Sequence, residues 1–387
     1  MASVFKGSER RRKRHAATLR RDTLPRPRQP EAPESALELE RVHDPADIAE
    51  EWDALALASR NVFATRTFLS LWLEHHGDGR ELLLRVCREP VSGRAVGILP
   101  LYRWRRFPLS VVRFLGHGAG DELGPICAPE DASRVARALQ QALAEDAPRL
   151  FVGERLPADP GLSLSGARTV VREGSPTIFL SHSDFDDYLA SRSSNFRQQL
   201  RRGERKLARD HSLRYRPLTR ESFDDDFELL VSLHADRWRQ RSSFLRDLDF
   251  HRRFARLAAD RGWLRLWILE LDGAAAAAWY GFSFAGVKSY YQAGRDRNWD
   301  GASVGMILLA HTVREALAEG LDEYRLLRGA ESYKYRFTDD DEGLATVVVS
   351  RGLLAGGAMR AAELARTLRR AAARTVPIGP AAAEPRT

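Results

Sequence analysis

The sequence has 387 residues, enough for two ordinary domains. Hydrophobic residues at 43% and charged residues at 29% exclude a chain that is disordered or fibrous throughout. The net charge of +8 would suggest nucleic-acid binding if it were spread over the body. Residues 1–35 hold ten Lys/Arg against four acidic residues, and residues 352–387 hold six against two, which leaves 45 basic and 47 acidic residues between them. The basicity therefore belongs to the ends, and nucleic acid is not an expected partner.

Both ends are predicted to lie outside the folded body. Residues 1–35 combine the basic run with four prolines and are expected to form a disordered basic arm, and residues 375–387 a disordered tail. Residues 352–374 are rich in Ala, Leu and Arg and predict a helix with a solvated face; contact of its arginines with anionic lipid is the alternative. The sequence has no apolar run of about 18 residues and no apolar signal segment. We expect a cytoplasmic protein, with peripheral contact at the inner membrane through the basic ends left open.

The first half, residues 36–178, shows an alternating order of elements. Strands are predicted at 36–42, 81–88, 94–105, 110–115 and 150–155, and helices at 45–57, 67–76 and 130–145. The glycine-rich loop 116–120 lacks GxGxxG spacing and is followed by two acidic residues, which argues against a dinucleotide loop. We expect His117 and Asp121 to face an acceptor cleft between the halves.

The second half, residues 179–351, repeats this order. Helices are predicted at 194–210, 222–239, 249–261 and 303–319, and strands at 213–217, 263–271, 274–284, 287–293, 323–327 and 344–350, with a turn at Asp272-Gly273. The prediction is an α/β (α+β) fold of two similar halves, each a mixed, mostly antiparallel sheet flanked by helices.

Four sequence blocks of the second half occur in a defined order. They read SSNFRQQLRR from residue 193, LHADRW from 233, SYYQAGRDRNWDGASVGM from 289 and YRLLRGAESYKYRF from 324. This ordered set resembles GNAT-superfamily acyltransferases of the BioF2-like and cellulose-biosynthesis (CelD-like) type, which are related to FemAB-like transferases. The resemblance implies two GNAT-like halves and an activity in polysaccharide or cell-envelope biosynthesis.

The resemblance also implies a place for the acyl donor. In a GNAT fold one strand splays from its neighbour, and the following helix offers bare backbone N–H groups that suit the pyrophosphate of coenzyme A. The expected cofactor-binding residues are Gly294, Gly301, Ser303, Val304 and Gly305, with acetyl-CoA or another acyl-CoA as donor. The loop departs from the Arg/Gln-x-x-Gly-x-Gly/Ala pattern of ordinary acetyltransferases, so an aminoacyl-tRNA donor, as in FemAB relatives, stays open. An ordinary helix with Ser303 as N-cap is the structural alternative.

Acyl transfer needs a group that removes a proton and donors that stabilise the oxyanion. The catalytic candidates are Glu331 as base, Tyr333 as proton donor to the leaving thiolate, Lys334 as phosphate or oxyanion ligand, and His234. A surface ion pair of Glu331 with Lys334 and a core histidine at His234 are the structural alternatives.

Three functions remain in competition. The first is N- or O-acyl transfer from acyl-CoA to an amine or hydroxyl of a small molecule, saccharide or cell-envelope precursor. The second is FemAB-like transfer from aminoacyl-tRNA, and the third is a non-catalytic GNAT scaffold. The four-residue spacing of Arg197, Arg201, Arg205 and Arg209 places them on one helical face, which either receives an anionic acceptor or is solvated. No metal is expected, because the histidines lack partners at ligand spacing and Cys87 and Cys127 form no CxxC pair.

Overall fold

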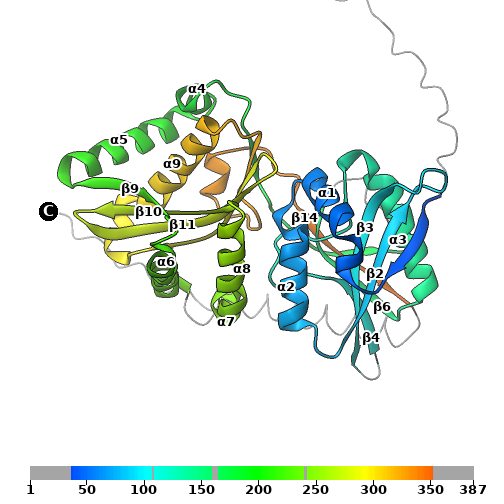
Figure 1. Ribbon diagram of the computed structural model, residues 1–387. Helices are drawn as coiled ribbons and strands as arrows, with labels where there is room; N and C mark the ends of the chain where they lie inside the picture. Colours follow the sequence, from blue (N-terminus) through cyan, green and yellow to red (C-terminus); the bar gives the residue numbers. More distant parts are fainter. Residues whose placement is uncertain (1–35, 107–108, 159–163, 239–241, 352–387) are drawn as a thin grey trace, which may run out of the picture. The chain divides into compact units, whose positions relative to one another are not determined.

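The computed structural model describes residues 36–106, 109–158, 164–238 and 242–351, which all belong to one compact unit (Figure 1). The predictions made for residues 1–35, 352–374 and 375–387 lie outside this part of the chain. Within it, two sheets of eight and six strands carry helices on their faces.

The first sheet has the strand order β1-β2-β3-β4-β6-β14-β7, and β5 pairs with β3. Its strands are β1 (Glu38–Val42), β2 (Arg80–Arg88), β3 (Ala95–Arg106), β4 (Leu109–Phe114), β5 (Ile126–Cys127), β6 (Leu150–Pro157), β7 (Arg168–Glu173) and β14 (Leu344–Ser350). Helix α3 (Ala132–Asp146) packs on one face through a stripe that includes Val135, Leu139 and Leu143. Helices α1 (Ala49–Ser59) and α2 (Arg66–His76) belong to the core on the other face, and the Thr65 hydroxyl caps α2 by accepting a hydrogen bond from the Phe68 N–H.

The second sheet has the order β8-β13-β12-β11-β10-β9. Its strands are β8 (Thr177–Phe179), β9 (Leu213–Pro217), β10 (Leu264–Leu271), β11 (Ala274–Phe284), β12 (Val287–Arg295) and β13 (Glu323–Arg325). The central strand β11 is buried along most of its length because helices cover both faces of the sheet. The predicted Asp272-Gly273 turn is confirmed: both residues have positive φ, at 53° and 83°, as a two-residue type I′ hairpin requires.

Two helical layers enclose this sheet, as Figure 1 shows. On one face lie α4 (Phe185–Ala190), α5 (Ser194–Asp210) and α9 (Val304–Ala318). On the other lie α6 (Phe223–Trp238), α7 (Ser243–Arg246) and α8 (Leu248–Asp260). The second layer shares one hydrophobic core with α2: Phe68 meets Phe254 edge to face, with ring centroids 4.8 Å apart. The two halves are therefore joined by a continuous core.

Each sheet contains one parallel pair at the corresponding place. β4 and β6 are parallel and connected through α3, and β12 and β13 are parallel and connected through α9; the other pairs are antiparallel. A parallel connection needs a crossover, which here is a helix in both halves. The predicted fold of two similar halves with mixed, mostly antiparallel sheets is confirmed.

The halves exchange strands at their ends, which the sequence did not indicate. β14, predicted to close the second half, instead lies between β6 and β7 of the first sheet, so that prediction is wrong. Conversely, β8 begins within the range 36–178 assigned to the first half but pairs with β13 of the second sheet. A strand pairs with whichever unpaired sheet edge lies next to it in the folded chain. The sequence of a short apolar strand does not specify which of the two sheets that is.

Candidate functional site

The parallel pair of the second sheet separates after three residues. β12 pairs with β13 only from Val287 to Ser289, yet β12 continues to Arg295, while β13 ends at Arg325. The chain then turns sharply at Leu327, which has a φ of 53°. This separation opens a gap between β12 and the segment that follows β13, which is the splay the sequence resemblance implied.

A cavity of about 230 Å³ lies at this splay. It is lined by residues 290–293 of β12, by the segment after β13, and by the loop of the first half that contains Gly118, Ala119 and Asp121. All four predicted catalytic residues line it, namely His234, Glu331, Tyr333 and Lys334. Residues separated by up to 216 positions in the sequence thus meet at one site formed by both halves.

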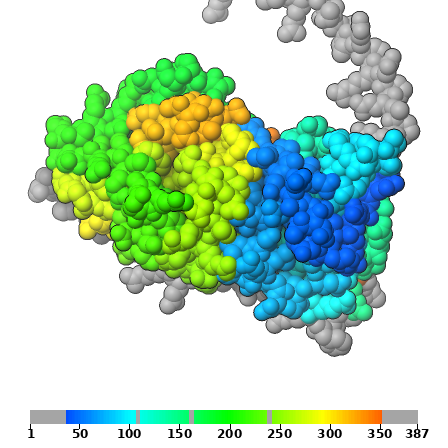
Figure 2. Space-filling model, viewed as in Figure 1, coloured from blue at the N-terminus to red at the C-terminus, as the bar shows by residue number. Residues whose placement is uncertain are grey.

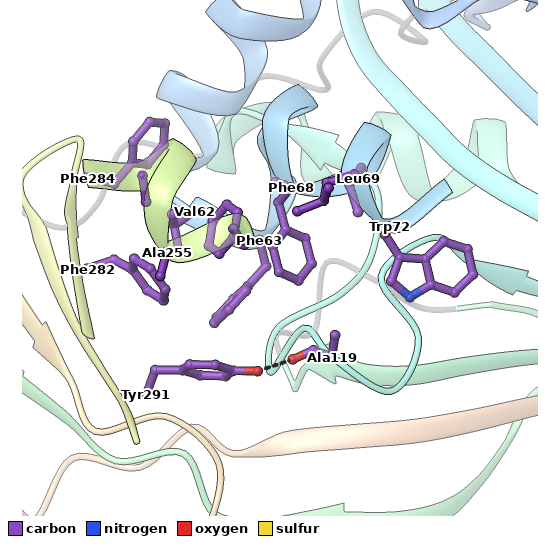
Figure 3. Close-up of a cluster of buried hydrophobic side chains, with 14 of the residues drawn as sticks. Val62, Phe63, Phe68, Leu69, Trp72, Ala119, Ala255, Phe282, Phe284 and Tyr291 are labelled. Carbon is purple, nitrogen blue, oxygen red and sulfur yellow. Dashed lines mark hydrogen bonds between the residues drawn. The ribbon is translucent and has the colours of Figure 1, made fainter. Parts of the chain in front are cut away.

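A β-bulge shapes the wall of the cavity on β12. Tyr280 pairs with Gln292 and Gly281 pairs with Tyr290, so Tyr291 is an extra, unpaired residue. A bulge re-aims the side chain of the inserted residue and is common beside active sites. Here it turns the Tyr291 ring into the shared core, where its hydroxyl donates a hydrogen bond of 2.7 Å to the Ala119 carbonyl (Figure 3). The bulge therefore ties β12 to the loop that carries Asp121.

Asp121 is the carboxylate of the first half that enters the cavity. Its nearest cations are Arg155, 3.6 Å away, and Arg328, 3.9 Å away, both beyond hydrogen-bond distance. Burial raises the pKa of Asp121, and the two arginines only partly offset this effect. A buried carboxylate with a raised pKa is a stronger proton acceptor than an exposed one.

Lys334 is buried, with 3% of its surface exposed, and each of the three N–H groups of its ammonium has a partner within the protein. It donates to the carbonyls of Leu327, at 3.2 Å, and Arg328, at 2.8 Å, and pairs with Glu331 at 3.1 Å. Burial lowers the pKa of Lys334, and Glu331 partly offsets this effect. Lys334 thus holds the turn after β13 in place and presents Arg328 to the cavity.

His234 bridges two elements on the other side of the cavity. Its Nδ1 lies 2.8 Å from the Ala293 carbonyl of β12, and its Nε2 lies 2.8 Å from the Ser242 hydroxyl that begins α7. The residue is 97% buried, consistent with the core position considered as the alternative, yet it also lines the cavity. Ser242 was not singled out from the sequence, because a lone serine before a short helix carries no recognisable signal.

The residues predicted to bind the donor lie elsewhere on the second half. Gly294 packs against α6, where an added Cβ would approach the His234 backbone nitrogen to 2.5 Å, so glycine is required there for packing. Ser303, with a φ of 57°, holds the N-cap position of α9 that the structural alternative gave it, but its side chain makes no cap hydrogen bond. Val304 is buried, whereas a Cβ added at Gly301 or Gly305 would meet open space. Their role in cofactor binding stays a prediction.

His117 does not lie in the same cavity as Asp121. It pairs with Glu154 at 3.0 Å and lines a neighbouring groove of about 470 Å³, which touches the cavity through Gly118 and Arg328. A third cavity of about 360 Å³ contains Glu122 and Arg325 but none of the predicted site residues, and we assign no chemistry to it.

Metal ligation and membrane spanning find no support in the part of the chain that the structure describes. There, no group of three or more His, Cys, Asp or Glu residues is arranged to hold a metal ion. Over the same residues, no helix has the length and apolar character needed to cross a bilayer.

Comparison with known proteins agrees with this geometry. Residues 194–335 match the family profile of the acetyltransferase (GNAT) domain, a range that includes α9, the splay and Lys334. The second half of the chain therefore contains a GNAT-type domain. No curated protein matches the sequence.

Among solved structures, FemX superposes with a TM-score of 0.58 at 11% identity, covering 81% of this chain and 97% of FemX. A conserved protein of unknown function from Bacteroides thetaiotaomicron superposes with a TM-score of 0.52 at 11% identity, covering 80% of this chain and 99% of that one. Both matches extend over the two halves, so the fold is shared along most of the chain.

Proposed function

We propose that this protein is an N- or O-acyltransferase that moves an acyl group from acyl-CoA to an amine or hydroxyl. The observation that carries the proposal is the cavity at the β12–β13 splay, where a buried carboxylate from one half meets His234, Tyr333 and Lys334 from the other. A transferase needs a proton acceptor beside the point where donor and acceptor meet, and this cavity provides one.

Asp121 is the proposed base for the acceptor. Its raised pKa increases its affinity for the proton of an ammonium or hydroxyl group, and its position on the loop of the first half leaves the splay free for the acyl group. Glu331 is the weaker candidate, because its carboxylate is 45% exposed and already pairs with Lys334. Tyr333, which lines the cavity, is the proposed proton donor to the leaving thiolate.

The first turn of α9 supports an acyl-CoA donor. Gly301 and Gly305 have open space where a side chain would lie, so a phosphate can approach the backbone closely. The Arg336 guanidinium lies 3.5 Å from the Met306 sulfur in the same turn and adds a positive charge. A helix N-terminus with an adjacent arginine suits a pyrophosphate.

For the acceptor we propose a precursor of a polysaccharide or of the cell envelope. This part rests on the resemblance to the BioF2-like and CelD-like transferases, whose sequence blocks contain the splay and the Lys334 turn.

Thermal unfolding with acetyl-CoA and longer acyl-CoAs tests the donor. A ligand at about one hundred times its Kd adds about 2.7 kcal/mol to the stability of the folded state, which raises Tm by a few degrees. We expect this shift to disappear in Gly305→Glu and to persist in Ala208→Glu, which adds the same charge on an exposed position of α5. The absence of a shift with every acyl-CoA would refute this donor.

One observation favours a second donor, aminoacyl-tRNA. Helix α5 lies at the surface of the molecule (Figure 2). It carries the half-buried Arg197 and the exposed Arg201, Arg205 and Arg209, and Asp186 and Asp210 pair with Arg201 and Arg209. A basic helix face attracts polyanions in a salt-dependent way. Activity that is lost after RNase treatment and in Arg201→Glu/Arg205→Glu would favour this donor over acyl-CoA.

A further inference from the structure

His234 and Ser242 form a histidine–serine pair inside the cavity. The Nε2–Oγ distance is 2.8 Å, and both residues line the cavity that also contains Asp121. His234 lies on α6, next to the bulged strand β12, and Ser242 lies at the start of α7, so the pair connects two elements of the helical layer. The direct transfer proposed above assigns its proton steps to Asp121 and Tyr333 and uses neither His234 nor Ser242.

The protonation of the pair follows from its partners. A carbonyl oxygen can only accept, so the His234 Nδ1 must carry a proton and donate it to Ala293 over 2.8 Å. In the neutral ring Nε2 then holds a lone pair, and the 2.8 Å contact requires the Ser242 hydroxyl to donate to it. The Ser242 oxygen also accepts from the Leu245 N–H at 3.3 Å, which leaves one lone pair.

This arrangement meets the requirements for an activated nucleophile. A hydroxyl must lie within hydrogen-bond distance of a base, and a third group must orient that base. Here Ser242 is the hydroxyl, His234 the base and the Ala293 carbonyl the orienting group. The Arg328 guanidinium lines the same cavity and offers a positive charge for a developing oxyanion.

We propose that Ser242 accepts the acyl group before the final acceptor, so that transfer proceeds through an acyl-serine. This inference rests on the proposed function for its thioester donor. The Ser242 Oγ attacks the thioester carbonyl while its proton moves to His234 Nε2. The C–S bond then breaks, and the thiolate takes that proton from His234, in place of the Tyr333 proton that direct transfer would use, and leaves as free coenzyme A. An ester on Ser242 and a neutral His234 remain.

The second half of the reaction reverses these steps with the acceptor. Asp121 removes the proton that an ammonium acceptor must lose before it can attack. The amine attacks the ester carbonyl, His234 Nε2 takes its second proton, and the ester C–O bond breaks. His234 returns that proton to the Ser242 oxygen, which restores the pair, and Asp121 releases the first proton to solvent. Donor and acceptor therefore need not occupy the cavity of about 230 Å³ together.

Labelling with p-nitrophenyl acetate tests the acyl-serine without any assumption about coenzyme A. The full chain is mixed with the ester, p-nitrophenolate release is followed, and the protein is quenched in acid for mass spectrometry. We expect a burst of one p-nitrophenolate per chain and one acetyl group on the peptide that contains Ser242. His234→Gln should slow the burst by on the order of 100-fold.

Matched variants locate the label. Ser242→Ala should abolish it, and Ser243→Ala, one residue along, should leave it on Ser242. Ser242→Cys should carry the acetyl group as a thioester, which shows that the site still folds when Ser242→Ala does not label. Labelling that persists in Ser242→Ala, or no burst in the wild-type chain, would overturn the proposal.

The labelling experiment and the acyl-CoA thermal shift test the acyl-serine and the acyl-CoA donor independently of each other. An acyl-CoA thermal shift without an acetylated Ser242 would mean direct transfer, which overturns the acyl-serine and leaves the transferase. Labelling of Ser242 by p-nitrophenyl acetate without an acyl-CoA shift would support the pair and refute the donor.

Discussion

The Tyr291 hydroxyl donates a hydrogen bond of 2.7 Å to the Ala119 carbonyl, joining the bulged strand of the second sheet to a loop of the first half. Figure 3 shows the Tyr291 ring beside Phe63 and Phe282 in the core that the halves share. Two positions after Ala119 the same loop presents Asp121 to the cavity. The position of the proposed base therefore depends on a residue of the other half.

Tyr291→Phe removes this bond and leaves the ring in place. We expect unfolding to become easier by about 1–2 kcal/mol, because a buried carbonyl loses its partner, and we expect kcat to fall about tenfold as Asp121 loses its fixed position. Tyr324→Phe is the control, since it breaks a buried 2.8 Å bond to Thr312 away from the loop. Equal losses of kcat in the two variants would contradict a positioning role for Tyr291.

Asp121→Asn should abolish transfer and raise Tm at neutral pH. The folded-state pKa of Asp121 is raised, so the folded protein binds its proton more tightly than the unfolded chain does. The carboxylate therefore reduces stability as the pH rises from the unfolded-state pKa of 3.8 through the higher folded-state pKa, and Asn removes this penalty. The gain in Tm should be absent near pH 3, grow as the pH rises above about 4, and level off above the folded-state pKa. Glu331→Gln should retain most activity, and the reverse ranking would identify Glu331 as the base.

Lys334→Met should destabilise the protein more than a surface substitution. The variant leaves the Leu327 and Arg328 carbonyls without their donor, which costs about 1–3 kcal/mol for each buried group that water does not reach. Urea unfolding measures the loss. We also expect lower activity, because the turn positions Arg328. A Lys334→Met protein that loses stability but keeps full activity would instead fit a purely structural role for this lysine.

His251 should make the stability depend on pH between about 4 and 6.5. Burial lowers the pKa of His251 to about 4 from an ordinary 6.5, and Asp247 only partly offsets this. The unfolded chain therefore binds a proton that the folded protein excludes, and stability falls as the pH drops through this range by up to about 3 kcal/mol.

Urea unfolding of His251→Leu at several pH values measures that contribution. We expect a shallower fall below pH 6.5, with His43→Gln, an exposed position, as the control. The buried His311, whose pKa is also lowered to about 4, should preserve part of the dependence in the variant. An unchanged slope in His251→Leu would assign the whole effect to other groups.

Local patterns were sufficient for most helices and strands. The predicted helix 194–210 matches α5, and the predicted strands 213–217 and 274–284 match β9 and β11, because their periodicity and caps are encoded within each segment. The same patterns gave no indication of β7 (Arg168–Glu173), α4 or α7, which are short and depend on neighbours for their stability.

The site was predicted only in part. His234, Tyr333 and Lys334 were found through ordered motifs, and the structure does bring them to one cavity. Three features depend on contacts that no local motif records. The Lys334 ammonium is held by backbone carbonyls, His234 contacts Ser242, and His117 lies in a different cavity from Asp121.

The sequence by itself determined the order of elements, the two similar halves and the near-neutral body between basic ends. These properties are local, since a helix face or a turn is specified by residues a few positions apart. Only the tertiary structure decided that β14 completes the first sheet, that β8 joins the second, and that His117 and Asp121 lie in separate cavities. Strand pairing across long separations and burial of a charge are set by which surfaces meet when the chain collapses, and no short pattern records that choice.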